Sequence, residues 1–144
     1  MYPFYLELEL YKPVVDYFKK QGYVVKREVR IGFCRADIVA FKDGKTTAVE
    51  LKLNDWKKAI VQAKNYQLGT NYVYLAFPLM KSYIVLRKAE LTLKKEGIGL
   101  LTVNEKTCKV CKIIDATQSR RTMGTITLEE LKRNWKKRSK MNFF

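Results

Sequence analysis

Histidine is absent from the 144-residue sequence. The chain therefore lacks the side chain that most often serves as general acid or base near neutral pH. Its absence excludes Ser-His-Asp triads and Cys₂His₂ zinc sites. Any chemistry must use carboxylates, lysines, tyrosines or cysteines.

Cysteine is scarce as well, with only Cys34, Cys108 and Cys111. Cys108 and Cys111 have the spacing of half a zinc site, but no second pair completes a tetrahedral set. Their segment reads as a strand, where residues three apart face opposite sides. We therefore expect structural thiols rather than a metal or redox site.

Long apolar runs are also missing. None approaches the roughly 20 residues that cross a bilayer, and acidic residues stand near the N-terminus where a secretory signal carries basic ones. The sequence has no GxxxxGK[ST] phosphate loop, which argues against a motor ATPase. A soluble, cytoplasmic protein without a membrane partner is the expectation.

Acidic residues are outnumbered, with 14 against 29 lysines and arginines and a formal net charge of +15. Such an excess favours a polyanionic partner, above all nucleic acid. A charge that only serves solubility and an acidic membrane surface are the alternatives that the charge alone leaves open.

Two apolar stretches in the middle of the chain, residues 35–41 and 46–53, are separated by Asp43-Gly44. An Asp-Gly pair between such stretches is a strong turn signal, because glycine tolerates positive φ. The pattern predicts a β-hairpin. One face is apolar and is expected in the core, with Ala36, Ile38, Ala40, Val49, Leu51 and Leu53.

The other face of this hairpin gathers charged side chains. With the turn at its centre, Asp37 directly faces Glu50, and Arg35 faces Lys52. Facing residues of an antiparallel pair have Cβ atoms about 4.5–5.5 Å apart. Two carboxylates held this close in a buried or half-buried place share a proton or bind a cation. Lys52 follows Glu50 by two positions and so shares its face.

The hairpin also carries a sequence motif. Its elements, in chain order, are Gly32, Ala36-Asp37, Glu50-Leu51-Lys52 and a QxxxY element from Gln62 to Tyr66. This set resembles the PD-(D/E)xK nuclease superfamily, and within it the RecB-like branch. Ala36 stands where the nominal pattern has proline. The resemblance covers roughly residues 1–80.

The resemblance implies a metal-dependent nuclease that hydrolyses phosphodiester bonds in DNA with Mg²⁺ or Mn²⁺. Mg²⁺ retains waters and needs few protein carboxylates. In the roles that the resemblance implies, the metal ligands are Asp37, Glu50, the carbonyl of Leu51 and Glu7, and the catalytic residues are Asp37, Glu50, Lys52 and Gln62. Glu9 is the alternative to Glu7, and both acids also suit a helix N-terminus without any metal.

Gln62 and Tyr66 are four residues apart on an expected helix, so they project from the same side. A plain interpretation is a Gln–Tyr pair that merely packs. The motif instead favours a pair that faces the site, contacting a phosphate or orienting Lys52. Tyr66 is therefore a candidate contact for nucleic acid. Arg35 is another, because it lies opposite Lys52 in the hairpin register.

Periodicity and turn signals predict the remaining elements. Helices are expected over residues 4–20, 54–68 and 81–95, and strands over 23–31, 35–41, 46–53, 72–77, 98–103 and 109–115. Pro13 either bends the first helix or lies in the first turn of a second segment. The continuously apolar strand at 72–77 is expected at the sheet centre. This order predicts an α/β fold with a central mixed sheet flanked by helices, and the resemblance implies a restriction-endonuclease-like core over residues 1–115.

Residues 116–144 predict a basic helical extension, with Thr127 capping a helix from Leu128. The basic residues expected to clamp phosphates are Arg120, Arg121, Lys132, Arg133, Lys136 and Lys137. A solvated tail is the alternative. Phe143-Phe144 and the many aromatic side chains leave room for a homodimer.

Two other functions fit the same residues. Asp37 and Glu50 can simply balance Lys52 and Arg35 in a nucleic-acid-binding module without activity. The chain can also be a subunit of a larger nuclease complex that needs a partner. The sequence leaves open whether the DNA is single-stranded, duplex or branched.

Overall fold

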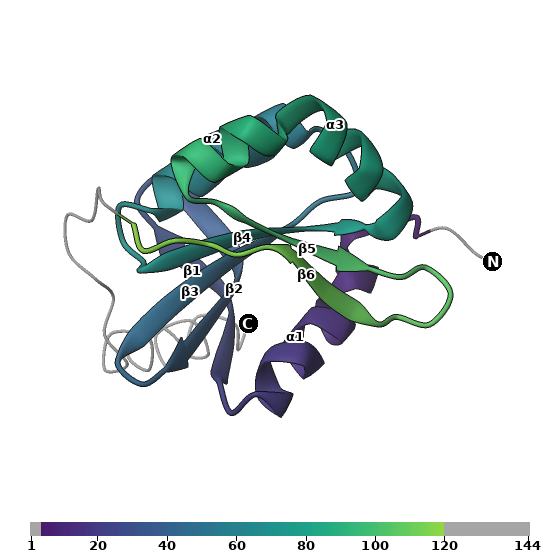
Figure 1. The fold of residues 1–144 in the computed structure, drawn as a ribbon. Coiled ribbons are helices and arrows are strands. Elements are labelled where there is room, and N and C mark those ends of the chain that lie inside the picture. The colour runs from purple at the N-terminus through teal and green to yellow at the C-terminus, as the bar shows by residue number, and fades with distance from the viewer. Residues whose placement is uncertain (1–3, 120–144) are drawn as a thin grey trace, which may run out of the picture.

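The computed structural model of the protein describes residues 4–119. Its elements are the 3₁₀ helix Glu7–Leu10, α1 Tyr11–Lys20, β1 Val24–Ile31, β2 Cys34–Lys42, β3 Lys45–Leu51, α2 Trp56–Tyr66, β4 Tyr72–Pro78, α3 Leu79–Glu96, β5 Gly99–Val103 and β6 Val110–Ile114. The strands form one six-stranded sheet, with α1 on one face and α2 and α3 on the other (Figure 1). The expected α/β fold with a mixed sheet flanked by helices is confirmed.

The strands follow one another across the sheet in chain order. β3, β4 and β5 run parallel, while β1–β2, β2–β3 and β5–β6 are antiparallel pairs. Every residue of β5, and every residue of β3 after Lys45, is buried. Parallel strands are typically covered on both faces in this way. β4 lies between β3 and β5, so the central place expected for residues 72–77 is confirmed.

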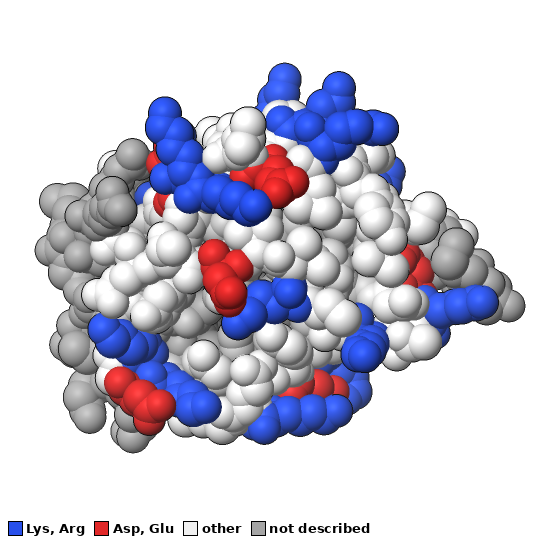
Figure 2. All heavy atoms as spheres, in the orientation of Figure 1, with Lys and Arg blue, Asp and Glu red and all other residues white. Residues whose placement is uncertain are grey.

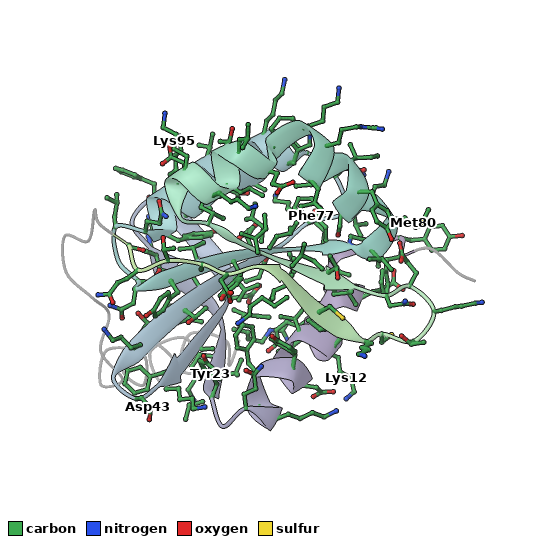
Figure 3. All side chains as sticks on the ribbon, viewed as in Figure 1. Lys12, Tyr23, Asp43, Phe77, Met80 and Lys95 are labelled. Atoms are coloured by element: carbon green, nitrogen blue, oxygen red, sulfur yellow. The ribbon has the colours of Figure 1, made fainter. Side chains whose placement is uncertain are left out.

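Apolar side chains fill the space on each side of the sheet. One core lies under α2 and α3 and includes Phe77, which Figure 3 shows between the sheet and α3, while Met80 and Lys95 lie at the periphery. The second core lies against α1 and includes Leu10 and Phe18. Each fully buried side chain of this size contributes about 1.5–3 kcal/mol, so the two cores hold the three layers together.

The N-terminal segment is two elements instead of one long helix. A 3₁₀ turn at Glu7–Leu10 precedes α1, and Pro13 is the third residue of α1. Proline is tolerated in a first helical turn, where its missing N–H has no intrahelical acceptor. The second of the two expected arrangements is therefore the correct one.

The hairpin register agrees with the turn at Asp43-Gly44. Ile38 pairs with Val49, and Lys42 pairs with Lys45 beside the turn. Gly44 has φ +76, as a tight hairpin turn requires.

The faces of β1 and β2 exchange at Glu28 and Asp37, where the ladder between these strands has no pair. Ile38 packs on the α1 side, whereas Ala36 packs on the α2 side. Glu28 has φ 53, a conformation that costs a non-glycine residue about 1–2 kcal/mol. The expectation that Ala36 and Ile38 share one core is wrong, because regular alternation stops between them. At this exchange Asp37 has no ladder partner in either β1 or β3.

Several expectations concern single features. Cys34, Cys108 and Cys111 are free thiols. No helix within residues 4–119 is long and apolar enough to cross a membrane. The expected helix from Leu128 lies outside the described residues, as do the expected phosphate contacts Arg120, Arg121, Lys132, Arg133, Lys136 and Lys137 and the Phe143-Phe144 pair.

Candidate active site

Asp37 lies where β2 and β3 separate. At the end of the hairpin away from the turn, the last pair of the β2–β3 ladder is Ile38 with Val49. Beyond it, the backbone N–H of Leu51 donates to Asp37 Oδ2 at 2.7 Å. A side-chain oxygen thus replaces a backbone acceptor, so the expected direct pairing of Asp37 with Glu50 is replaced by a bond to the residue after Glu50.

Glu50 is the second carboxylate, and it is only 5% exposed. The Tyr66 hydroxyl donates to its Oε1 at 2.6 Å, and the Lys52 ammonium lies 3.7 Å from its Oε2. Lys52 is itself 8% exposed, and its backbone N–H donates to the Ala76 carbonyl at 3.0 Å. Glu50 and Lys52, an acidic and a basic side chain, are therefore held next to each other in a largely buried place.

Burial and repulsion raise the pKa values of both carboxyl groups. Burial raises the pKa of Glu50 from 4.5 to about 7, and the charge of Asp37 adds to the rise, while the hydrogen bond from Tyr66 opposes it. Burial also raises the pKa of Asp37, and the charge of Glu7 acts in the same direction. Acids with raised pKa values in one place are a signal of a functional site, because a bound cation would offset their repulsion.

Tyr66 supports this pair from inside the protein. It is 0% exposed, and its hydroxyl lies 2.6 Å from Glu50 Oε1 and 3.0 Å from the carbonyl oxygen of Arg35. Burial and the neighbouring Glu50 raise the pKa of Tyr66, so its hydroxyl keeps its proton. The expected contact of Tyr66 with nucleic acid is wrong, because its side chain has no exposed surface; the residue that it orients is Glu50, not Lys52.

Gln62 lies one helical turn before Tyr66 on α2, on the same side of the helix. Its Oε1 is buried and has no hydrogen-bond partner. A buried acceptor without a donor costs about 1–3 kcal/mol, so this oxygen marks a place that suits a donor from a ligand or a water. The orientation of the Gln62 side chain toward the site stays a prediction.

The two N-terminal acids have different surroundings. Glu7 Oε2 accepts from the backbone N–H of Leu53 at 3.4 Å, and its charge acts on Asp37 and Glu50. Glu9 instead caps the 3₁₀ turn, since its Oε1 accepts from two backbone N–H groups at 2.8 Å. Glu7 is therefore the acid that approaches the site, as expected.

Arg35 does not face Lys52. The β2–β3 ladder ends before Arg35, whose cross-strand partner is Arg30 of β1. The expected pairing is wrong because the strands have already separated at Asp37. The Arg35 side chain is exposed, and its contact with a phosphate stays a prediction.

Sequence patterns do not reveal two residues that shape this site. Asn65 fixes the β1–β2 turn, since its Nδ2 donates to the Ile31 carbonyl at 2.6 Å. Glu28 raises the pKa of Asp37 through its charge. Asn65 had one available signal, its place inside the QxxxY element, whereas Glu28 looks like an ordinary polar strand residue.

An open hollow leads from solvent to Lys52. It has a volume of about 530 Å³ and is lined by Tyr5, Leu6, Glu7, Lys52, Leu53, Asn54, Asp55 and Lys58. The N-terminus of α2 lies at this hollow, with Asp55 as its cap, and such a terminus favours anions. A larger hollow of about 850 Å³ lies between α1 and residues 108–110. There Asp16 forms an ordinary ion pair with Lys12 at 2.9 Å. The smaller hollow is the one that reaches Lys52, beside the carboxyl group with the raised pKa.

The donor set fits a hard divalent cation only in part. Within residues 4–119, no group of three or more acidic or cysteine side chains is placed to hold a metal ion. Glu7, Asp37 and Glu50 thus do not form a three-carboxylate cage. Mg²⁺, however, is commonly bound by one or two carboxylates and keeps several waters. The pair Asp37 and Glu50, whose charges repel each other, suits such a hydrated ion.

Comparisons with known proteins bear on the fold. No protein-family model matches the chain, and no curated protein matches it. Among solved structures, a protein of unknown function from Silicibacter pomeroyi is similar, with a TM-score of 0.65 and 14% sequence identity. The match covers 98% of this chain and 86% of that one. At this identity the likeness shows a shared α/β fold and nothing about activity.

Proposed function

We propose that the protein is a metal-dependent nuclease with a restriction-endonuclease-like core. The observation that carries the proposal is the buried carboxyl group of Glu50 beside the half-buried one of Asp37, with the Lys52 ammonium 3.7 Å from Glu50. The pair lies at the carboxyl end of the parallel strand β3, the end at which open α/β sheets place their ligands. Natural proteins rarely bury two acids together without a use for them.

Each side chain has a defined part in this proposal. A divalent ion, when bound, neutralises charge on the phosphodiester and helps to activate a water. Asp37 and Glu50 would hold it, with the carbonyl of Leu51 as the further ligand that the sequence resemblance implies. Lys52 lies between this pair and the open hollow, where its ammonium group can stabilise negative charge on a phosphate. Lys58, on the rim of the same hollow, can hold a neighbouring phosphate.

The distribution of charge supports a polyanionic substrate. The formal net charge is +15, and Figure 2 shows basic side chains over the helix layer of α2 and α3, with acidic ones among them. Positive charge on the protein releases counterions from a nucleic acid and so favours binding.

A panel of substrates tests the proposal. Purified protein is incubated with single-stranded, duplex and branched DNA, and with RNA, in Mg²⁺, in Mn²⁺ and in chelator. We expect cleavage of at least one DNA substrate that is lost in chelator and restored by added metal. Tight binding without cleavage of any substrate would contradict the nuclease.

A binding module without activity is the second candidate, and two contacts favour it. Lys52 already lies beside Glu50, and Leu51 already donates to Asp37, so the site is partly neutralised without a metal. Titration calorimetry separates the two functions. If the site is that of a nuclease, the wild-type protein gives a heat of Mg²⁺ binding and the Asp37→Asn protein gives none. If the site is a salt-bridged module, neither protein gives a heat of Mg²⁺ binding.

Replacing Tyr66 with phenylalanine is expected to move the acidic limb of the cleavage profile to higher pH. In the wild-type protein the Tyr66 hydroxyl lowers the pKa of Glu50. Removing this hydroxyl is therefore expected to raise the pKa of Glu50 further. A hydrogen bond to a charged group is worth about 1.5–3 kcal/mol, which corresponds to roughly 1–2 pH units. The measurement is kcat/KM against pH.

Tyr72→Phe is the matched control, because Tyr72 lies at the start of β4, at the other end of the strand from Ala76. Its profile should match that of the wild-type protein. A Tyr66→Phe protein whose rate falls equally at every pH would show that Tyr66 only fills space.

A further inference from the structure

The turn between β1 and β2 is hydrogen-bonded to a side chain of α2. Asn65 Nδ2 donates to the Ile31 carbonyl at 2.6 Å, and the backbone N–H of Phe33 donates to Asn65 Oδ1 at 3.4 Å. Gly32 has φ +61, and a Cβ there would lie 2.6 Å from Asn65 Oδ1. Glycine tolerates this positive φ, and a side chain at position 32 would displace the Asn65 amide that holds the turn.

This turn presents an aromatic ring to solvent, and a pair of arginines lies near it on the two strands that the turn joins. Phe33 is 92% exposed. Arg30 and Arg35 are cross-strand partners, separated from the turn by the pair Ile31 and Cys34, and both are exposed. Directly facing residues project from the same face of a sheet. A single exposed apolar side chain is ordinary, but a ring on a hydrogen-bonded turn with a pair of arginines on the adjoining strands has the features of a nucleic-acid contact.

The turn is also connected to the candidate active site. Asn65 and Tyr66 are adjacent on α2, and the Tyr66 hydroxyl lies 3.0 Å from the carbonyl oxygen of Arg35 and 2.6 Å from Glu50. Asp37 follows Phe33 by four residues, which is about 13 Å along a strand. That distance corresponds to about four stacked base steps of one strand.

We propose that residues 30–35 form a base-stacking platform, in which Phe33 stacks on an unpaired nucleobase while Arg30 and Arg35 bind the flanking phosphates. The substrate class is then a nucleic acid with a single-stranded stretch, because a base within a duplex offers no free face to the ring. The placement of this stretch beside a cleavage site rests on the proposed nuclease function, whereas the stacking itself does not.

The test uses the full chain with Asp37→Asn, so that no substrate is consumed. The probes are a single-stranded oligonucleotide with 2-aminopurine at successive positions and a blunt duplex of the same sequence. We expect 2-aminopurine at one position to be quenched in the complex. Adding Phe33→Ala should remove this quenching and weaken single-strand binding by at least about 5-fold, as the loss of one stacked base does. Phe33→Trp should retain both.

Duplex binding should change little in the Phe33→Ala protein. Tyr83→Ala is the matched control, since Tyr83 is an exposed aromatic residue on α3, and its affinity for the single strand should equal that of the parent. Unchanged single-strand binding by Phe33→Ala, an equal loss for single strand and duplex, or no binding by the parent protein would each overturn the platform. So would a change in sedimentation that assigns Phe33 to self-association. Specific stacking in a wild-type protein that cleaves nothing would leave the platform standing and remove the nuclease.

Discussion

Replacing Asp37 with asparagine is expected to reduce metal-dependent cleavage at least about 1,000-fold, since a bound metal ion supplies several kcal/mol of transition-state stabilisation. Asparagine has the same shape, and its side-chain oxygen can still accept from the Leu51 N–H, which now donates to Asp37 Oδ2 at 2.7 Å. The change therefore removes one negative charge and keeps the end of the hairpin in place. Nucleic-acid affinity should stay within about two-fold, because phosphate contacts dominate it.

The measurements are single-turnover cleavage rates and equilibrium binding in the same buffer. Asp43→Asn is the matched control: Asp43 lies in the β2–β3 turn with φ 52, and asparagine tolerates that conformation. Its cleavage rate should equal that of the wild-type protein. Cleavage by Asp37→Asn at the wild-type rate would show that this carboxylate has no part in the reaction, even if the protein is a nuclease.

The hairpin that carries the site is the part of the fold that short-range signals predict best. Asp43-Gly44 determines the turn, and the turn determines the register, so the pairing of Ile38 with Val49 follows from a few letters of sequence. The gathering of Asp37, Glu50 and Lys52 at one end follows from the same register.

The details of the site depend on contacts that no local pattern contains. The exchange of faces between Ala36 and Ile38 accompanies a left-handed backbone at Glu28, and glutamate gives no sign of it in sequence. Tyr66 was expected at the substrate because the QxxxY motif favours a site-facing pair, and four-residue spacing places Tyr66 on the same side of a helix as Gln62. Spacing gives the direction of a side chain and not its depth, which is set by how closely α2 packs on the sheet.

A second large effect is expected at Glu50. Glu50→Gln should raise the free energy of unfolding in metal-free buffer at pH 8 by an amount on the order of 2 kcal/mol, and should abolish stabilisation by Mg²⁺. The reason is that the native protein holds Glu50 in a buried place beside Asp37, where the charged form is disfavoured. Glutamine can still accept from the Tyr66 hydroxyl, but it brings no charge.

The direction with pH follows from the pKa values of the two states. The pKa of Glu50 is about 7 in the native protein against 4.5 for the free side chain. Between these values the native state binds more protons than the unfolded state, so the stability of the wild-type protein falls as pH rises from about 4.5 to about 7. At pH 4 both states are largely protonated at Glu50, and the wild-type and Glu50→Gln proteins should unfold at similar temperatures. The difference should grow through this window and level off above it.

Adding Mg²⁺ should make the wild-type protein more stable than the Glu50→Gln protein, which reverses their order in metal-free buffer. An ion that binds the ionised pair stabilises the native wild-type protein, by about 2.7 kcal/mol at 100 times its dissociation constant, and the Glu50→Gln protein lacks one of the two charges that attract it. Thermal unfolding at pH 8, with chelator and with increasing Mg²⁺, measures both effects in one series. Glu90→Gln is the matched control, because Glu90 pairs with Lys94 on the exposed side of α3. A Glu50→Gln protein that gains as much from Mg²⁺ as the wild-type protein would place the cation elsewhere, and the buried acids would then serve only to balance Lys52.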